Sequence, residues 1–309
     1  MLELIMSDTK FFIGPMSKNV VDCIIDFSKT CNIGLIPSRR QVDYCGGYVN
    51  NWNTQSFSEY VKSQNKSILI CRDHGGENQG QNIDDGMKSF TVDCNYFDLI
   101  HVDPFRTSET IQQSAKKTKN IIQKLWNINP NIFYEVGTEE AIFKYSPDEL
   151  KWFLNDLKKN LSEDQFNQIK YAVVQSGTGL SLSNRKNTGK FNKNLLLEFI
   201  GVAKEFKLLS KEHNGDYLID SSGISVRLDL GLDSINIAPE FGQIESEVYL
   251  DYCKNTSLFD VLYRICYNSG KWKKWISDVN QVSKKQIIMT CCHYVLSDQI
   301  FVEKIKNNS

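Results

Sequence analysis

Three of the four histidines in this sequence stand at the end of a short apolar run, where their imidazole side chains could bind a metal ion. These residues are His74, His101 and His213. Neutral imidazole is the commonest transition-metal ligand, and a catalytic zinc site needs about three protein ligands beside an open position. A lone histidine in such a place more often caps the strand by hydrogen bonding, but three at equivalent places favour a metal site.

Carboxylates accompany the histidines. Asp73 immediately precedes His74, and Glu135 lies near the end of another apolar run. Neighbouring side chains on a regular strand point to opposite faces, whereas at a strand-to-loop junction the backbone turns and both can reach one pocket. Asp73 is therefore a candidate acid/base for proton exchange with a substrate hydroxyl, with an Asx turn as the alternative. Glu135 as a ligand would favour a harder ion, manganese or magnesium, over zinc.

Lys211 points to a different chemistry. It shares strand parity with His213, which predicts an inward direction for both side chains. A desolvated lysine can form a Schiff base with a ketone, so Lys211 is a third catalytic candidate beside Asp73 and Glu135. The alternative is an ordinary structural lysine.

Two segments could bind a phosphate group. Residues 177–190 combine glycines, hydroxyls and cations, whose N–H groups, side-chain donors and charge can all meet phosphate oxygens. The segment does not match the nucleotide P-loop pattern, and its alternative is a flexible solvated loop. A pair of adjacent arginines could clamp an anion bidentately or pair with Asp43. The candidate substrate-binding residues are Arg39, Arg40, Gln175, Gly177, Ser181, Asn214 and Asn236.

Eight apolar runs of strand length recur along the chain, each followed by a turn signal and a polar stretch with helical period. Runs without apolar/polar alternation suit parallel strands covered on both faces. The repeated order predicts an α/β fold, a single (β/α)8 TIM barrel whose site lies at the carboxyl ends of the strands, with a doubly wound open sheet as the alternative. The runs are 11–14, 33–36, 68–71, 98–103, 132–136, 171–174, 208–213 and 234–238.

The C-terminal part of the chain differs from the rest. Up to about residue 243, helices alternate with the apolar runs; residues 146–157, for example, begin with a serine N-cap and a proline at the first helical position. Beyond that point the pattern becomes helical and aromatic. We expect a barrel over 1–243 and a helical extension over 244–309 packed on it, with the lysines of 271–274 covering a helical surface.

Composition excludes several classes of protein. The 309 residues include 36 basic and 37 acidic side chains, so no whole-molecule basic field exists to hold nucleic acid or an acidic membrane. Nine cysteines without a Cys-x-x-Cys pair give no disulfide or zinc-finger framework. No apolar stretch approaches the ~20 residues needed to cross a bilayer, and the first residues lack a secretion signal. We expect a cytoplasmic protein that binds neither nucleic acid nor membrane.

The strand-end residues resemble those of one enzyme family. Asp73-His74-Gly75 after an apolar strand is similar to the Asp-His-Gly strand end of class II, metal-dependent ketose-bisphosphate aldolases. The closer resemblance is to the second, non-catalytic subunit of class II tagatose-bisphosphate aldolase, and it covers nearly the whole chain in order and spacing. The segments that carry it are 41–48, 73–78, 100–103, 137–139, 173–177, 212–213, 235–237, 272–275 and 296–298.

The resemblance implies roles for individual residues. Asp73 would be the acid/base at the substrate hydroxyl, and His74 and His213 would bind the metal. Glu135 would lie near the metal, and the loop around Asn236 would face a substrate phosphate.

One departure from the family pattern stands out. Active class II aldolases have another metal-binding histidine at the end of strand 6, where this chain has Gln175 and no histidine nearby. Either His101, Glu135 or Gln175 completes the coordination shell, or the chain binds no catalytic metal.

Taken together, the sequence predicts an aldehyde-lyase that makes or breaks a carbon–carbon bond in a phosphorylated sugar with a divalent metal, zinc first and manganese or magnesium as alternatives. One rival is a non-catalytic subunit that stabilises an aldolase partner. Another is a sugar-phosphate isomerase or epimerase that uses the same enediolate chemistry. The resemblance also implies assembly, either as a homo-oligomer or with a partner subunit.

Overall fold

Eight short parallel strands close into a barrel in the computed structural model, which describes residues 2–218, 223–276 and 278–308. The strands follow each other around the barrel in chain order, so the predicted TIM barrel is confirmed and the open sheet is excluded. Each predicted apolar run overlaps one strand, although β3 extends beyond its run to Gly75 and β6 begins two residues before its run. The barrel strands are β1 (Phe11–Ile13), β2 (Gly34–Leu35), β3 (Leu69–Gly75), β4 (Leu99–Val102), β5 (Phe133–Val136), β6 (Ile169–Val174), β9 (Leu209–Glu212) and β10 (Ser234–Ile237).

Helices cover the outside of the barrel, and local sequence signals fix where they begin. In α6 the Ser146 side chain accepts from the backbone of Glu149 while the Glu149 side chain reciprocates, and Pro147 takes the first helical position. The helix predicted there is confirmed. The helices between strands are α2 (Lys18–Phe27), α3 (Thr54–Gln64), α4 (Met87–Tyr96), α5 (Ile111–Trp126), α6 (Pro147–Asn160), α7 (Glu163–Asn167), α8 (Lys193–Glu205) and α9 (Ile224–Asp229).

The barrel interior is apolar at the amino ends of the strands and polar toward the carboxyl ends. Helix α1 (Leu2–Asp8) covers the amino ends, where Met6 packs with Phe12, Leu69 and Tyr171. The Tyr171 hydroxyl also donates to the Met6 carbonyl oxygen over 2.9 Å. This apolar plug leaves the carboxyl ends as the open side of the barrel.

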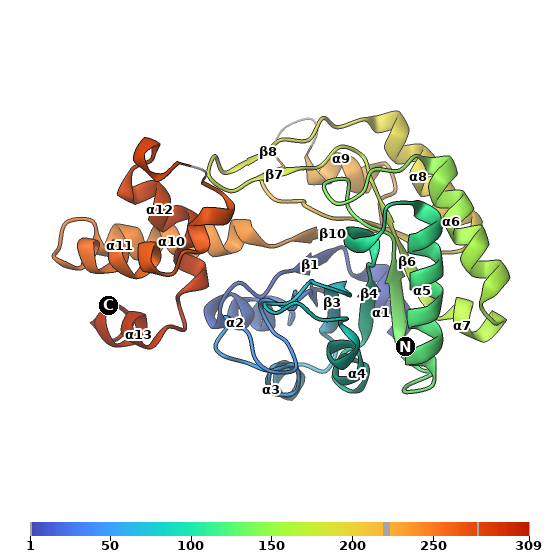
Figure 1. Ribbon diagram of the computed structural model, residues 1–309, viewed down its shortest axis with the longest axis horizontal. Coiled ribbons are helices and arrows are strands. Elements are labelled where there is room, and N and C mark those ends of the chain that lie inside the picture. The colour runs from blue at the N-terminus through green and yellow to red at the C-terminus, as the bar shows by residue number, and fades with distance from the viewer. Residues whose placement is uncertain (1, 219–222, 277, 309) are drawn as a thin grey trace.

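The C-terminal helices form a separate group with its own apolar core (Figure 1). Helix α10 (Pro239–Cys253) leads to them from β10, and the predicted boundary at 243/244 lies inside this helix. The division into two domains therefore stays a prediction. The remaining elements are α11 (Leu258–Asn268), η3 (Lys271–Lys274), η4 (Val279–Gln281), α12 (Lys284–Cys291), η5 (Cys292–Tyr294), α13 (Gln299–Lys304) and η6 (Lys306–Asn308).

This C-terminal group contacts the loop that follows β2. The rings of Tyr48 and Tyr294 meet edge to face with centroids 5.0 Å apart, and the Asn50 backbone N–H donates to the Ser297 hydroxyl over 2.7 Å. The extension thus reaches the open side of the barrel. Among the helices of the described residues, none has the length and hydropathy of a bilayer span.

Candidate functional site

The end of β3 is irregular, and the irregularity aims two consecutive side chains at the barrel mouth. Arg72 pairs with Ile100 of β4 and Gly75 with Val102, so the two residues between them stand opposite one residue of β4. Such a bulge re-aims side chains. His74 also has a φ of 43°, a left-handed conformation that costs free energy in a non-glycine residue and concentrates at functional sites. Asp73 and His74 therefore both face the mouth, as expected at a strand-to-loop junction.

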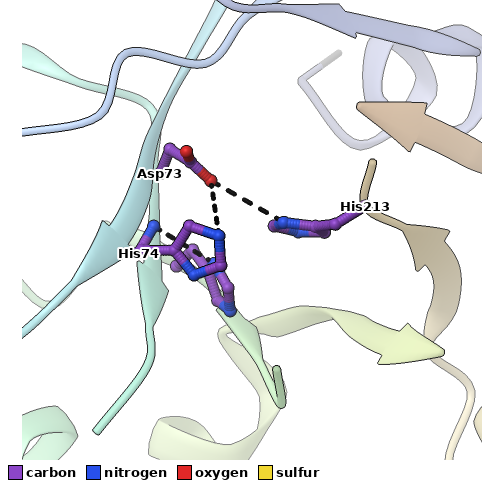
Figure 2. A group of neighbouring side chains, drawn as sticks. Asp73, His74 and His213 are labelled. Atoms are coloured by element: carbon purple, nitrogen blue, oxygen red, sulfur yellow. Dashed lines mark hydrogen bonds and ion pairs between the residues drawn. The ribbon is translucent and has the colours of Figure 1, made fainter. Parts of the chain in front are cut away.

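Three imidazole rings meet at this mouth. The ring centroids of His74 and His101 lie 5.1 Å apart, those of His74 and His213 5.1 Å, and those of His101 and His213 4.9 Å. Figure 2 shows His74 and His213 reaching toward the Asp73 carboxylate from different strands. One nitrogen of each ring and one Asp73 oxygen all lie within 4.8 Å of one another. We call these four residues the imidazole cluster.

Each histidine holds one ring nitrogen in a hydrogen bond and leaves the other facing the cluster. His74 Nδ1 is 2.6 Å from Asp103 Oδ2, and His213 Nε2 is 2.6 Å from Glu135 Oε1. Both partners are carboxylates and accept, so these nitrogens donate. This is the outer arrangement that metal-binding histidines have, because it fixes the ring and leaves the second nitrogen's lone pair free.

His101 follows the same rule through a backbone acceptor. Its Nε2 is 2.9 Å from the carbonyl oxygen of Gly137 and must donate, because a carbonyl only accepts. Gly137 has a φ of +109°, and a side chain there would lie 2.9 Å from the Tyr145 hydroxyl, so this turn requires glycine. The Nδ1 atom of His101 accepts only a long bond, 3.3 Å, from the His74 backbone N–H.

The donor set fits a divalent cation. Three neutral nitrogens and a carboxylate oxygen are ligands that zinc takes in tetrahedral sites. Asp73 Oδ1 is buried without a hydrogen-bond partner in the described residues, and its contacts to His74 Nε2 and His213 Nδ1 are 3.6 Å and 3.7 Å. An oxygen left this way inside a protein is costly unless something binds it.

Surplus negative charge surrounds the cluster. Burial tends to raise the pKa of Asp103, but the hydrogen bond and charge of His74, with smaller contributions, together outweigh it, and the pKa lies below its usual value. Burial opposes the ionised form of Glu139 too, but the His74 contact and charge bring its pKa down to about 2. Burial alone would lower the pKa of His74, yet the Asp73 charge and the Asp103 hydrogen bond raise it well above its usual value. The field at this point favours positive charge.

A buried ion pair supports the cluster from below. Glu135 Oε2 accepts from Lys211 Nζ over 2.6 Å, and both side chains are 0% exposed. Burial would raise the pKa of Glu135, but the Lys211 charge and the neighbouring histidines hold it well below its usual range. Lys211 Nζ also lies 3.5 Å from the Phe12 ring centroid. The structure thus places Glu135 behind His213 and Lys211 below the mouth.

A cavity of about 220 Å³ opens over the cluster. Asp73 and His74 line it, whereas His101 and His213 are not among its lining residues. Asn214, a predicted site residue, lines the cavity and donates to Glu139 Oε2 over 2.6 Å. The other lining residues are Met16, Ser38, Arg40, Gln41, Tyr48, Gln79, Arg106, Glu139, Ala238, Pro239, Lys274, Trp275 and Tyr294.

Sequence reasoning missed the residues that the C-terminal extension and the β4 loop bring to the cavity. Lys274, Trp275 and Tyr294 come from the extension, and Arg106 from the loop after β4. Trp275 belongs to the segment 272–275 that carries the family resemblance, but the resemblance did not predict its position at the cavity. Nothing in the local sequence predicts this folding back, because it depends on long-range packing.

Two predicted substrate-binding residues bind other groups of the protein and do not line the cavity. Arg39 is buried and binds the carboxylates of Asp43 and Asp84, the pairing that the sequence left open. The Gln175 amide donates to the carbonyl oxygens of Thr138 and Phe143, at 2.9 Å and 2.8 Å. Gln175 is therefore turned away from the imidazole cluster.

The glycine-rich segment 177–190 folds on itself. It contains the hairpin β7 (Leu180–Ser181) and β8 (Lys186–Asn187). A side chain at Gly177 would lie 2.0 Å from the Lys190 carbonyl oxygen, so the glycine serves this closure. Ser181 accepts from Asn184 over 3.0 Å, and neither Gly177 nor Ser181 lines the cavity. Asn236 lies on β10, and its buried amide has no partner among the described residues.

Comparison with known proteins finds likeness in structure alone. No family model matches the chain, and no curated protein matches its sequence. A probable tagatose 6 phosphate kinase from Sinorhizobium meliloti matches with a TM-score of 0.72 at 14% identity, over 96% of this chain and 86% of that one. The fructose-bisphosphate aldolase of Campylobacter jejuni matches with a TM-score of 0.57 at 10% identity, over 99% and 92%.

A third similar structure is an epimerase. The fructuronate-tagaturonate epimerase of Cohnella laeviribosi matches with a TM-score of 0.62 at 8% identity, over 98% of this chain and 78% of that one. At such identities the likeness establishes a shared barrel fold. The fold-level resemblance to class II aldolases expected from the sequence is confirmed, and the chemistry has to be argued from the site.

Proposed function

We propose that this protein is a metal-dependent aldolase that acts on a phosphorylated ketose. The convergence of His74, His101 and His213 on Asp73, with each outer ring nitrogen held by an acceptor, is the observation that carries the proposal. His101 supplies from β4 the third imidazole that the sequence lacks at the end of β6. The resemblance of the strand-end motifs and the shared fold support the same reaction class.

The cation we propose is zinc. Three imidazole nitrogens favour zinc over magnesium, which prefers an octahedral oxygen shell, and they leave a fourth position open for the substrate. Both oxygens of Glu135 accept hydrogen bonds, one from His213 and one from Lys211. Glu135 therefore orients the His213 ring and is not itself a ligand that would favour manganese or magnesium. A divalent cation here would act as a Lewis acid on a substrate carbonyl oxygen.

Asp73 is the residue we propose to move the proton. It lines the cavity with 21% of its side chain exposed, so a substrate hydroxyl can reach it. In the cleavage direction Asp73 takes the hydroxyl proton, the carbon–carbon bond breaks, an aldehyde forms, and the electron pair passes to the ketone-bearing fragment. A proton then returns to that fragment. Asn214 and Glu139 line the same cavity and can orient the substrate's hydroxyls.

Substitution of the acid/base tests the proposal. We expect Asp73→Asn to lower turnover on the preferred sugar phosphate by roughly 10²- to 10⁴-fold, the usual contribution of a positioned acid or base. The amide keeps the shape of the carboxylate, so thermal stability should stay within a few degrees of the unchanged chain. Retro-aldol assays on a panel of ketose phosphates, read by release of the aldehyde fragment, provide the measurement.

Two results would contradict the proposal. Unchanged turnover in Asp73→Asn would remove this residue from the chemistry. A pure chain that retains no metal and cleaves no sugar phosphate, but raises the activity of an added aldolase partner, would instead be the supporting subunit that the sequence left open.

A second candidate, an epimerase, has its own observation. Asp73 Oδ1 and Glu139 Oε2 each lie 3.6 Å from His74 Nε2, so two carboxylates flank the proposed cation position. Two bases can remove and return a proton on different faces of one carbon. Product analysis separates the two reactions, because epimerisation releases no aldehyde fragment.

A further inference from the structure

Three cations line the cavity, and two of them, Arg40 and Lys274, also line a second cavity that no residue of the imidazole cluster lines. Arg40 comes from the loop after β2, Arg106 from η1 (Phe105–Thr107) after β4, and Lys274 from η3. They belong to three segments that are far apart in the sequence and meet only at this opening. We call them the cationic rim.

The rim cations have no carboxylate partner among the described residues. The side chains of Arg40 and Lys274 make no hydrogen bond or ion pair with those residues, and the Arg106 side chain donates to the neutral Gln79 amide oxygen over 3.0 Å. The adjacent Arg39 shows the contrast, because it is bound by the carboxylates of Asp43 and Asp84. The rim leaves its charge available.

The rim charges repel one another. Enclosure by the cavity walls, then the charges of Arg40 and Arg106, lower the pKa of Lys274 to about 8 despite the opposing charge of Glu139. Cations held together without counter-ions cost free energy that a bound anion would relieve.

Aromatic side chains stand beside Lys274. Lys274 Nζ lies 4.3 Å from the ring centroid of Trp275, and the Trp275 indole N–H donates to the Tyr294 hydroxyl over 3.3 Å. A second cavity of about 380 Å³ shares Arg40, Tyr48, Lys274 and Tyr294 with the first, and no residue of the imidazole cluster lines it. An anion bound by Arg40 and Lys274 would therefore sit where the two cavities adjoin.

We propose that the cationic rim of Arg40, Arg106 and Lys274 binds the dianionic phosphate end of the substrate and so selects sugars phosphorylated at the end remote from the imidazole cluster. This rests on the proposed function for the identity of the substrate. Three cations match a dianion better than a monoanion, and the arginine guanidinium presents paired donors to phosphate oxygens. A carboxylate end group would use one arginine and leave two cations unmatched.

Calorimetric titration of the full-length chain with sulfate tests the rim, since sulfate is a dianion that does not titrate in the working pH range. We expect Arg40→Gln, Arg106→Gln and Lys274→Gln each to raise the dissociation constant about tenfold, the usual effect of one charge-assisted hydrogen bond. Lys273→Gln is the matched control, because Lys273 is the exposed neighbour on the same short helix and lines neither cavity. Inorganic phosphate should follow sulfate, and acetate should bind at least about tenfold more weakly.

Equal sulfate affinity in all three rim variants and in the control would overturn the proposal, and so would acetate binding as tightly as sulfate. Equal affinity in all four variants is the result expected if sulfate bound to a metal ion in the imidazole cluster and not to the rim. The readout is independent of catalysis: Asp73→Asn should keep the sulfate affinity while it loses turnover. Failure of the aldolase proposal and failure of the rim are therefore distinguishable.

Discussion

The imidazole cluster and the cationic rim both contribute to one cavity and are built in opposite ways. In the cluster, every histidine is held from behind by Asp103, Glu135 or the Gly137 carbonyl. In the rim, the cations come from loops and the C-terminal extension, and within the described part of the chain their side chains have no carboxylate partner. The cluster is preorganised by strands that hold its geometry, whereas the rim presents uncompensated charge.

This difference teaches how the cavity divides its work. Groups that must hold a cation and a reacting atom need fixed positions, and strand ends with second contacts provide them. Groups that recognise a charged end need free charge more than fixed position, and loops provide that. Substitutions in the cluster should therefore strongly reduce metal affinity. Substitutions in the rim should reduce anion affinity in smaller steps.

The largest expected effect is on the support beneath the cluster. Lys211→Met should lower the free energy of unfolding by about 3–5 kcal/mol, because it leaves the buried Glu135 carboxylate without its cation. Lys170→Met, which removes a pair with the exposed Glu3, should cost at most about 1 kcal/mol. Urea unfolding of both variants measures the contrast. A loss of less than about 1 kcal/mol in Lys211→Met would show that the pair does not anchor the cluster.

A smaller effect is expected behind His74. Asp103→Asn weakens the acceptor that holds His74 Nδ1 and should reduce zinc affinity by about 10- to 100-fold. Asp98→Asn is the control at the opposite end of β4, where the carboxylate accepts from Lys62 and from the Ile70 backbone. Competition with a chelator gives both affinities. If the two variants bind zinc equally well, the outer hydrogen bond does not tune the site.

The smallest effect is a pH dependence at the rim. Because the pKa of Lys274 is lowered to about 8 and its protonated form attracts anions, sulfate affinity should fall as pH rises from 7 to 9.5, by up to about tenfold. The other charged groups facing Lys274 are Arg40, Arg106 and Glu139, and burial raises the pKa of Tyr48 and Tyr294. Lys274→Gln should flatten the profile. A variant profile as steep as the unchanged one would assign the titration to another group.

The sequence was sufficient for the barrel and for much of the cluster. Apolar runs mark parallel strands directly, and strand ends in a barrel share one mouth, so His74, His101 and His213 could be brought together before any coordinates. The bulge that aims Asp73 and His74 together, and the outer partners of each ring, depend on the register between β3 and β4. A single sequence does not specify that register.

The anion-binding residues were harder to predict. Gln175 and the 177–190 segment have suitable side chains, but nearby carbonyl groups satisfy Gln175 and the segment closes on itself. Lys274 was expected to cover a helical surface and instead lines the cavity. Composition tells which groups can bind phosphate, whereas tertiary contacts decide which of them remain available.

Zinc binding tests the central claim most directly. Titration of the metal-stripped chain with zinc should saturate at about one ion per chain, and His101→Ala should weaken that binding at least about tenfold, because β4 supplies the third imidazole. A chain that binds no zinc, or a His101→Ala variant that binds it as tightly as the unchanged protein, would contradict the account.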